Sequence, residues 1–286
     1  MKDTVKTFAT PHGELAIDTA RDAKMAAVFE RGEYHQKDTV ELLSAFLSPE
    51  SVFVDGGAHI GTIAIPLARK AANTVAYEAD AATCAILRQN VERNNVSVTV
   101  RQKGIGAKPG HGEMASVREG NAGAHSLSVG EGGIEVVTLD GELEKFDMLK
   151  LDVEGMELAV LLGAARIIGE THPTVLFEVN LSQLRAHYTP LRALDSFFRM
   201  RRYHLYLPFR LGGVLTLGVV PSISLIALLM YPGAYLFRRT SSVFDVLAVP
   251  GGKQLPLPVV SSWHMLAFVF GENMRNKTRR IRKYFV

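Results

Sequence analysis

The sequence predicts an α/β protein with a mostly parallel sheet and helices on both faces. From Ser51 to about Val179, short apolar runs alternate with helix-like runs, which is the order that parallel β-α-β units require. The first apolar run ends at the turn Asp55-Gly56-Gly57. Ligands of open parallel sheets bind at the carboxyl ends of the strands, so this turn predicts a ligand site.

The expected elements follow from runs of apolar residues and their periodicity. The expected strands are Val52–Val54, Thr74–Tyr77, Val96–Arg101, Asp147–Leu151, Thr174–Val179, Tyr203–Leu207 and Val243–Val249. The expected helices are Ile60–Lys70, Ala81–Arg93, Glu157–Ile168, Leu184–Met200 and Ser261–Val286. The glycine-rich stretch Gly104–Gly133 predicts a mobile loop within an inserted hairpin that pairs Glu113–Val117 with Ile134–Thr138.

The amino-acid composition excludes several classes of protein and of site. The chain has 286 residues, of which 47% are hydrophobic and 21% charged, and this excludes a disordered chain. Its single cysteine, Cys84, excludes an internal disulfide framework and a cysteine-rich zinc site. The sequence also lacks an H-E-x-x-H motif, which argues against a zinc enzyme. The amino-terminal residues show no apolar secretion signal, so a cytoplasmic setting is expected.

Positive charge is concentrated at the carboxyl end. The net charge is +3, and residues 275–286 hold six basic residues and no acid. The rest of the chain has 26 basic against 29 acidic residues, a balance of −3. This distribution suggests peripheral contact with an anionic membrane surface, whereas nucleic acid is not the expected partner. A terminal helix docked on the core, with a solvated charged end, explains it equally well.

A long apolar stretch, Leu211–Phe237, contains 27 residues without a charge, enough for one bilayer crossing. Pro221 and Pro232 interrupt it, and a crossing would separate the strand Val243–Val249 from the sheet. Two interpretations remain open. The stretch dips into a membrane as a broken hairpin, or it forms an apolar cap over the site or the interface of a homo-oligomer.

The glycine turn favours a cationic ligand. Gly56-x-Ala58-x-x-Gly61 matches the dinucleotide fingerprint only loosely, and Asp55 would repel a pyrophosphate. The ammonium and sulfonium groups of S-adenosylmethionine suit Asp55 better. Glu78, at the end of the second strand, can accept hydrogen bonds from a ribose diol of either cofactor. Gly104-Ile105-Gly106, after the third strand, is expected to pack on an adenine face or to be a plain turn.

A second group of acids follows the fourth strand. Asp152 and Glu154 are expected to face the reacting end of the cofactor, where carboxylates orient a hydroxyl, accept its proton or hold a divalent metal. The alternative is that they only cap the following helix. Glu178 lies near the end of the fifth strand and is expected at the same rim. His125, in the glycine-rich loop, is a further candidate base, and His59 is a candidate helix cap.

These motifs resemble the FkbM family of S-adenosylmethionine-dependent methyltransferases, over roughly Gly32 to Asn180. The run from Leu149 to Leu158 is the most specific match. The other matching segments are Gly32-Glu33-Tyr34, Val54–Gly61, Tyr77-Glu78-Ala79-Asp80, Val137–Asp140, Phe177-Glu178-Val179 and Val246–Pro250. The resemblance implies a Rossmann-like class I methyltransferase sheet of seven strands, one of them antiparallel. It also implies methyl transfer to a hydroxyl of a sugar, lipid-linked glycan or polyketide.

On this interpretation the site residues fall into two sets. The residues expected to bind the cofactor are Asp55, Gly56, Gly57, His59, Gly61, Glu78, Ala79 and Ile105. The residues expected to act on the acceptor are Asp152, Glu154 and His125. No metal ligand is assigned, although a divalent metal beside the acids remains an option. An NAD(P)-dependent oxidoreductase and a non-catalytic membrane-associated module are the alternative functions.

The same interpretation divides the chain into four parts. Residues 1–48 are expected to form an amino-terminal cap of helices and strands, and residues 49–209 the cofactor-binding core. Residues 210–240 form the apolar insertion, which is not part of the family pattern. Residues 241–286 are expected to supply the closing strand and a basic helix.

Overall fold

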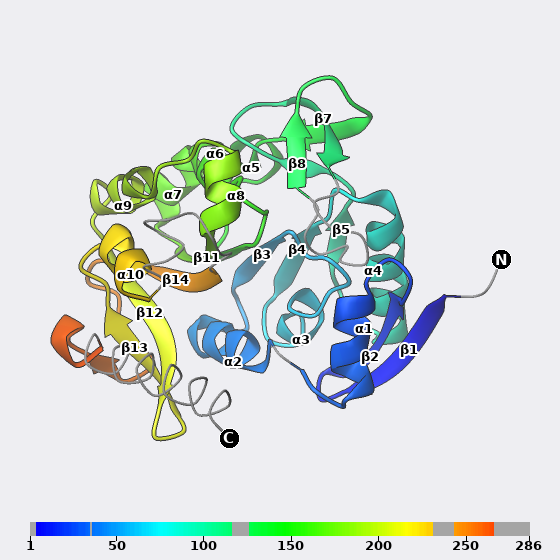
Figure 1. Ribbon diagram of the computed structural model, residues 1–286, viewed down its shortest axis with the longest axis horizontal. Coiled ribbons are helices and arrows are strands. Elements are labelled where there is room, and N and C mark those ends of the chain that lie inside the picture. The colour runs from blue at the N-terminus through cyan, green and yellow to red at the C-terminus, as the bar shows by residue number, and fades with distance from the viewer. Residues whose placement is uncertain (1–3, 35, 116–125, 231–242, 266–286) are drawn as a thin grey trace, which may run out of the picture. The chain divides into compact units, whose positions relative to one another are not determined.

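The computed structural model describes residues 4–34, 36–115, 126–230 and 243–265 (Figure 1). The chain divides into two compact units, Met1–Glu178 and Val179–Val286. The segment expected as an amino-terminal cap therefore belongs to the same unit as the predicted parallel strands.

Five parallel strands form the centre of the first unit, which ends within the last of them. The strands are β3 (Val52–Gly56), β4 (Asn73–Tyr77), β5 (Thr99–Arg101), β10 (Met148–Leu151) and β11 (Thr174–Asn180). Their order is β11-β10-β3-β4-β5, and every neighbouring pair is parallel. The five predicted strands are confirmed, although β5 is shorter than expected. Asp55 on β3 pairs in register with Lys150 on β10, so the carboxyl ends of these two strands meet at one edge.

Backbone geometry sets where the helices of the first unit begin and end. They are α3 (Ala64–Leu67), α4 (Ala81–Arg93), α5 (Leu139–Glu142), α6 (Glu157–Leu162) and α7 (Ala165–Thr171). The helix predicted from Ile60 to Lys70 was too long, and it cannot include Gly61, whose φ of +93° no α-helix accepts. The helix predicted from Glu157 to Ile168 is divided at Gly163, where an added Cβ would lie 2.0 Å from the Gly106 carbonyl oxygen.

Two smaller sheets complete the first unit. The amino-terminal hairpin pairs β1 (Val5–Thr10) with β2 (Gly13–Asp18), and it precedes α1 (Ala23–Glu30) and α2 (Lys37–Phe46). The second small sheet contains β6 (Gly104–Ile105), β7 (Gly110–Ala115), β8 (Ser126–Val129) and β9 (Ile134–Val137). Strand β7 runs antiparallel to β9, but the pairing predicted for Glu113–Val117 was wrong: Gly110–Gly112 pair with β9, whereas Glu113–Ala115 pair with β8. Strand β8, which pairs with the other edge of β7, was not predicted.

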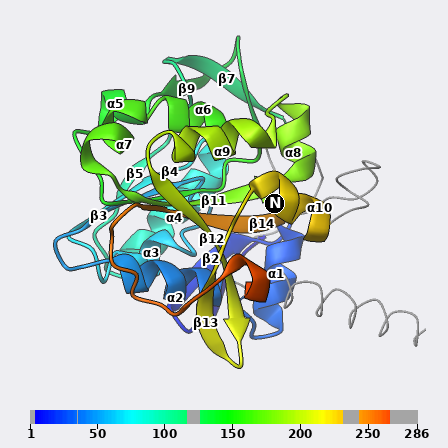
Figure 2. The same cartoon turned by 90° about the vertical axis from the view of Figure 1, so that its left-hand side faces the viewer.

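The second unit combines short helices with antiparallel strands. Its elements are α8 (Leu181–Ala186), α9 (Leu191–Arg199), β12 (Tyr203–Leu211), β13 (Val214–Val219), α10 (Ile223–Met230), β14 (Val243–Pro250) and β15 (Val259–Val260). Strand β12 runs antiparallel to both β14 and β13 (Figure 2), which confirms the expected antiparallel element and adds another pairing. The single helix predicted from Leu184 to Met200 was wrong: Pro190 separates α8 from α9.

The first part of the apolar stretch folds into ordinary secondary structure. Leu211 ends β12, and the stretch continues through β13 and α10 as far as Met230, while 231–237 lie outside the described residues. Leu217, Ile223 and Ile226 are fully buried, so their apolar character is used in packing. Among the described residues, no helix has the length and apolar content needed to cross a membrane. The basic run 275–286 also lies outside the described residues.

Candidate active site

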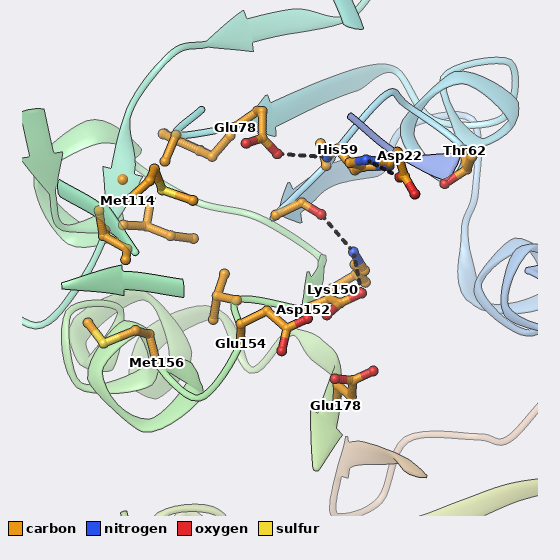
Figure 3. A pocket seen from close by; sticks show the side chains of 18 of the residues that line it. Asp22, His59, Thr62, Glu78, Met114, Lys150, Asp152, Glu154, Met156 and Glu178 are labelled. Carbon is orange, nitrogen blue, oxygen red and sulfur yellow. Dashed lines mark hydrogen bonds and ion pairs between the residues drawn. The ribbon is translucent and has the colours of Figure 1, made fainter. Parts of the chain in front are cut away.

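A cavity of about 440 Å³ lies at the carboxyl ends of β3, β4 and β10, and residues of the first unit alone line it (Figure 3). This volume is within the range of small-molecule sites. Acids, lysines and apolar side chains all contribute to the lining. Met114 and Met156 lie at one end of the cavity, and Asp22 and Thr62 lie at the other.

The glycine turn brings the main chain to the wall of this cavity. Gly57 has a φ of +75°, and a Cβ at this position would lie 1.9 Å from the carbonyl oxygen of Asp152. Only glycine allows this approach between the turn after β3 and the loop after β10. Gly57 and His59 line the cavity as expected, whereas Gly56 and Gly61 pack against neighbouring side chains beneath it.

Glu78 is held at the end of β4 by two backbone amides. Its Oε2 accepts a hydrogen bond from the His59 amide (2.9 Å), and its Oε1 accepts one from the Asp80 amide (2.9 Å). The side chain is 9% exposed, and burial raises the pKa of Glu78 above its usual value. Both Glu78 and the neighbouring Ala79 line the cavity, so the carboxylate is oriented before any ligand binds.

A contact between Asp22 of the amino-terminal segment and the His59 ring also supports the turn. Asp22 is 3% exposed, and its Oδ2 lies 3.1 Å from Nε2 of His59. Asp22 also caps α1 by accepting a hydrogen bond from the Met25 amide (3.0 Å). His59 was expected to cap a helix, but its ring instead connects the turn to α1. Asp22 was not among the predicted site residues, and its one local signal in the sequence is an acid just before a helix.

Lys150 lies between the two acid-bearing strand ends. Its Nζ donates a hydrogen bond to the Gly57 carbonyl (3.0 Å) and lies 3.2 Å from Asp55 and 3.7 Å from Asp152. Burial alone would lower the pKa of Lys150, but the two aspartates outweigh burial and raise it. Asp55 is completely buried and does not line the cavity, so the structure places the Lys150 ammonium, and not Asp55, at the surface open to a ligand.

Three carboxylates gather at the rim below Lys150. Asp152, Glu154 and Glu178 each offer an oxygen atom, and these atoms lie within 4.8 Å of one another (Figure 3). All three side chains are half-buried and line the cavity, which confirms that Glu178 shares a rim with the other two. Such a group can orient a hydroxyl or hold a cation, and exposed acidic groups are common without an ion.

The opposite end of the cavity is apolar. Ile105 is 4% exposed and lines the cavity together with Met114 and Leu127, which come from β7 and β8. Ile105 was predicted from the sequence, whereas Met114 and Leu127 were not, because they reach the cavity only through the folding of the glycine-rich insertion. His125, the remaining candidate base, lies outside the described residues.

Comparison with family models identifies a methyltransferase family. Residues 55–211, more than half of the chain, match the methyltransferase FkbM domain. The hexuronic acid methyltransferase AglP of Haloferax volcanii is 31% identical over 140 residues, or 46% of this chain. The match spans about half of that relative's length, at 56%.

Solved structures of methyltransferases also match, with low sequence identity. The methyltransferase FkbM from Methylobacillus flagellatus is 21% identical, with a TM-score of 0.41, and the match covers 57% of this chain and 44% of that one. Trm5b from Pyrococcus abyssi is 12% identical, with a TM-score of 0.46, and the match covers 87% of this chain and 56% of that one.

Removal of the Lys150 charge should destabilise the first unit. We expect Lys150→Met to reduce the free energy of unfolding by about 3–5 kcal/mol, because Asp55 would stay buried without its cation. Urea unfolding measures this loss. The double variant Lys150→Met/Asp55→Asn removes both charges and should recover more than half of it. A loss below about 1 kcal/mol in the single variant, typical of an exposed pair, would contradict this account.

Proposed function

Because the chain belongs to the FkbM methyltransferase family, we propose that it transfers a methyl group from S-adenosylmethionine to a hydroxyl of a sugar or sugar-linked acceptor. The observation that carries this proposal is one cavity lined by Glu78 at one strand end and by Asp152 and Glu154 at another. Glu78 suits the binding of a nucleoside, and Asp152 and Glu154 suit the binding of a hydroxyl-bearing acceptor.

The residues present fit the methyl donor. Gly57 lines the cavity with its main chain, and the turn requires glycine because any Cβ there would collide with the Asp152 carbonyl. Glu78 presents a carboxylate, already fixed by two amides, that can accept hydrogen bonds from the ribose hydroxyls. Ile105, Met114 and Leu127 provide an apolar surface for the adenine ring. When bound, the donor supplies an electrophilic methyl carbon.

The rim acids prepare the acceptor. Asp152 and Glu154 follow β10 and are placed to receive a hydroxyl, orient its oxygen toward the cavity and accept its proton. The Lys150 ammonium lies 3.7 Å from Asp152 and helps to fix the position of that carboxylate. We therefore assign the orienting role to Asp152 and the proton-accepting role to Glu154. Alignment of the oxygen with the methyl carbon supplies the remaining rate enhancement.

The name of the AglP relative suggests the class of acceptor to test first. We expect the protein to methylate a hydroxyl of a hexuronic acid, free or within a glycan, when it is incubated with S-adenosylmethionine. Mass spectrometry of the sugar, with neutral hexoses as the comparison, identifies the modified atom. Methylation of the carboxylate to an ester, or of no sugar at all, would contradict the proposed acceptor.

Loss of the Glu78 carboxylate should weaken binding of the donor. We expect Glu78→Ala to raise the dissociation constant of S-adenosylmethionine by roughly 10–100-fold, as expected for a lost hydrogen bond to a charged group. Isothermal titration calorimetry measures the constant. Glu50→Ala, which changes an exposed acid far from the cavity lining, is the matched control. Equal affinity in the two variants would remove Glu78 from the binding site.

Loss of the Glu154 carboxylate should affect turnover and spare binding. We expect Glu154→Gln to lower kcat by about 10²–10⁴-fold, the usual contribution of a general base, with an almost unchanged dissociation constant for the donor. The control is Glu144→Gln, which changes an exposed acid. If Glu154→Gln turned over at the wild-type rate, the proton would have to leave by another group.

A further inference from the structure

One buried acid next to the site is not used by the proposed chemistry. Glu157 is the first residue of α6, is completely buried, and does not line the cavity. Its Oε1 accepts hydrogen bonds from the amides of Val153 (3.4 Å) and Gly155 (3.2 Å). Its Oε2 is buried without a hydrogen-bond partner in the described part of the chain. An acid is costly to bury, so a specific reason for its presence is expected.

The two amides that Glu157 binds are on either side of Glu154. The backbone of Glu154 is left-handed, with a φ of +50°, and Gly155 follows with a φ of +100°. A residue with a side chain adopts this conformation only when its surroundings hold it there. Gly155 permits the conformation of the turn but does not hold the chain in it. Glu157 supplies the restraint, because one oxygen atom binds the chain immediately before and immediately after Glu154.

We propose that Glu157 is a positioning residue, which holds the left-handed turn at Val153–Gly155 and thereby fixes the Glu154 carboxylate at the acceptor rim. The inference rests on the proposed methyl transfer and deepens it. Glu157 does not touch the cavity, so it acts through Glu154. Cofactor binding depends on Glu78 and on the Gly57 turn, which belong to other strand ends, and should be independent of Glu157.

The role requires an oxygen acceptor rather than a charge. Burial raises the pKa of Glu157 to about 7, the backbone donors oppose this rise, and the charge of Asp152 adds to it. A carboxyl group near this pKa exists in both protonation states at neutral pH, and an oxygen in either state can accept the two amides. A glutamine should therefore replace Glu157 in this role, because its amide oxygen occupies the same place.

Two variants with side chains of similar length distinguish the loss of the hydrogen-bond acceptor at position 157 from a loss of packing. Glu157→Gln retains an oxygen at the turn, and Glu157→Met fills the same space with no oxygen. We expect the Met variant to lose kcat by about 100-fold, since small displacements of a reacting group have effects of this size. The Gln variant should stay within about threefold of the wild type. Calorimetry should give the same affinity for S-adenosylmethionine in both, and Glu170→Gln, on the exposed side of α7, is the control.

Hydrogen–deuterium exchange of the peptide that contains Val153 and Gly155 tests the restraint without an activity assay. We expect faster exchange there in Glu157→Met and near-wild-type exchange in Glu157→Gln. Unchanged exchange in the Met variant overturns the inference, and so does a Met variant that is folded and turns over like the Gln variant. If the wild type transfers no methyl group, the proposed function fails, and the exchange result still decides whether Glu157 holds the turn.

Discussion

The site depends on one buried cation, Lys150, which connects two neighbouring strand ends. Its ammonium contacts the carbonyl of Gly57 after β3 and the carboxylates of Asp55 and Asp152 on either side. Asp55 is completely buried and Asp152 is half-buried, so without this charge the two carboxylates would repel each other and burial would favour the neutral form of Asp55. With the charge in place, Asp55 stays in the interior and the Gly57 carbonyl is fixed. The contacts of Lys150 with Asp55, Asp152 and the Gly57 carbonyl therefore hold the glycine turn in position.

Around the cavity, polar contacts connect side chains from elements that lie far apart in the sequence. Glu78 is oriented by the amide of His59, and the ring of His59 is held in turn by Asp22 from the amino-terminal segment. Asn90 on α4 acts similarly, because it is fully buried and its side-chain amide donates hydrogen bonds to the carbonyls of Ala16 and Ile60 (3.0 Å each). These hydrogen bonds connect the amino-terminal hairpin to the glycine turn, and they define its position more precisely than apolar contacts alone would.

Much of the core was predictable because its signals are local. The apolar runs of β3, β4 and β10 are short and are followed by glycine or acidic residues, so both these strands and the edge that carries the candidate site could be located. Helix boundaries were predicted less well. Left-handed residues at His59 and Gly61, and the close approach of Gly163 to Gly106, depend on neighbours that hydropathy does not reveal. The apolar stretch after Leu211 was ambiguous for the same reason, since a buried hairpin and helix have the composition of a membrane segment.

The sequence by itself determined the fold class, the family resemblance and the edge of the sheet at which Glu78, Asp152 and Glu154 gather. It did so because strand ends, glycine turns and acids that follow strands are local features of the chain. Only the tertiary structure decided which of these residues face the cavity. It buried Asp55 against Lys150, brought Asp22 to His59, and added Met114 and Leu127 from the glycine-rich insertion. The physical reason is that each of these contacts joins segments far apart in the chain, and the partner of a buried charge is chosen by packing and not by spacing in the sequence.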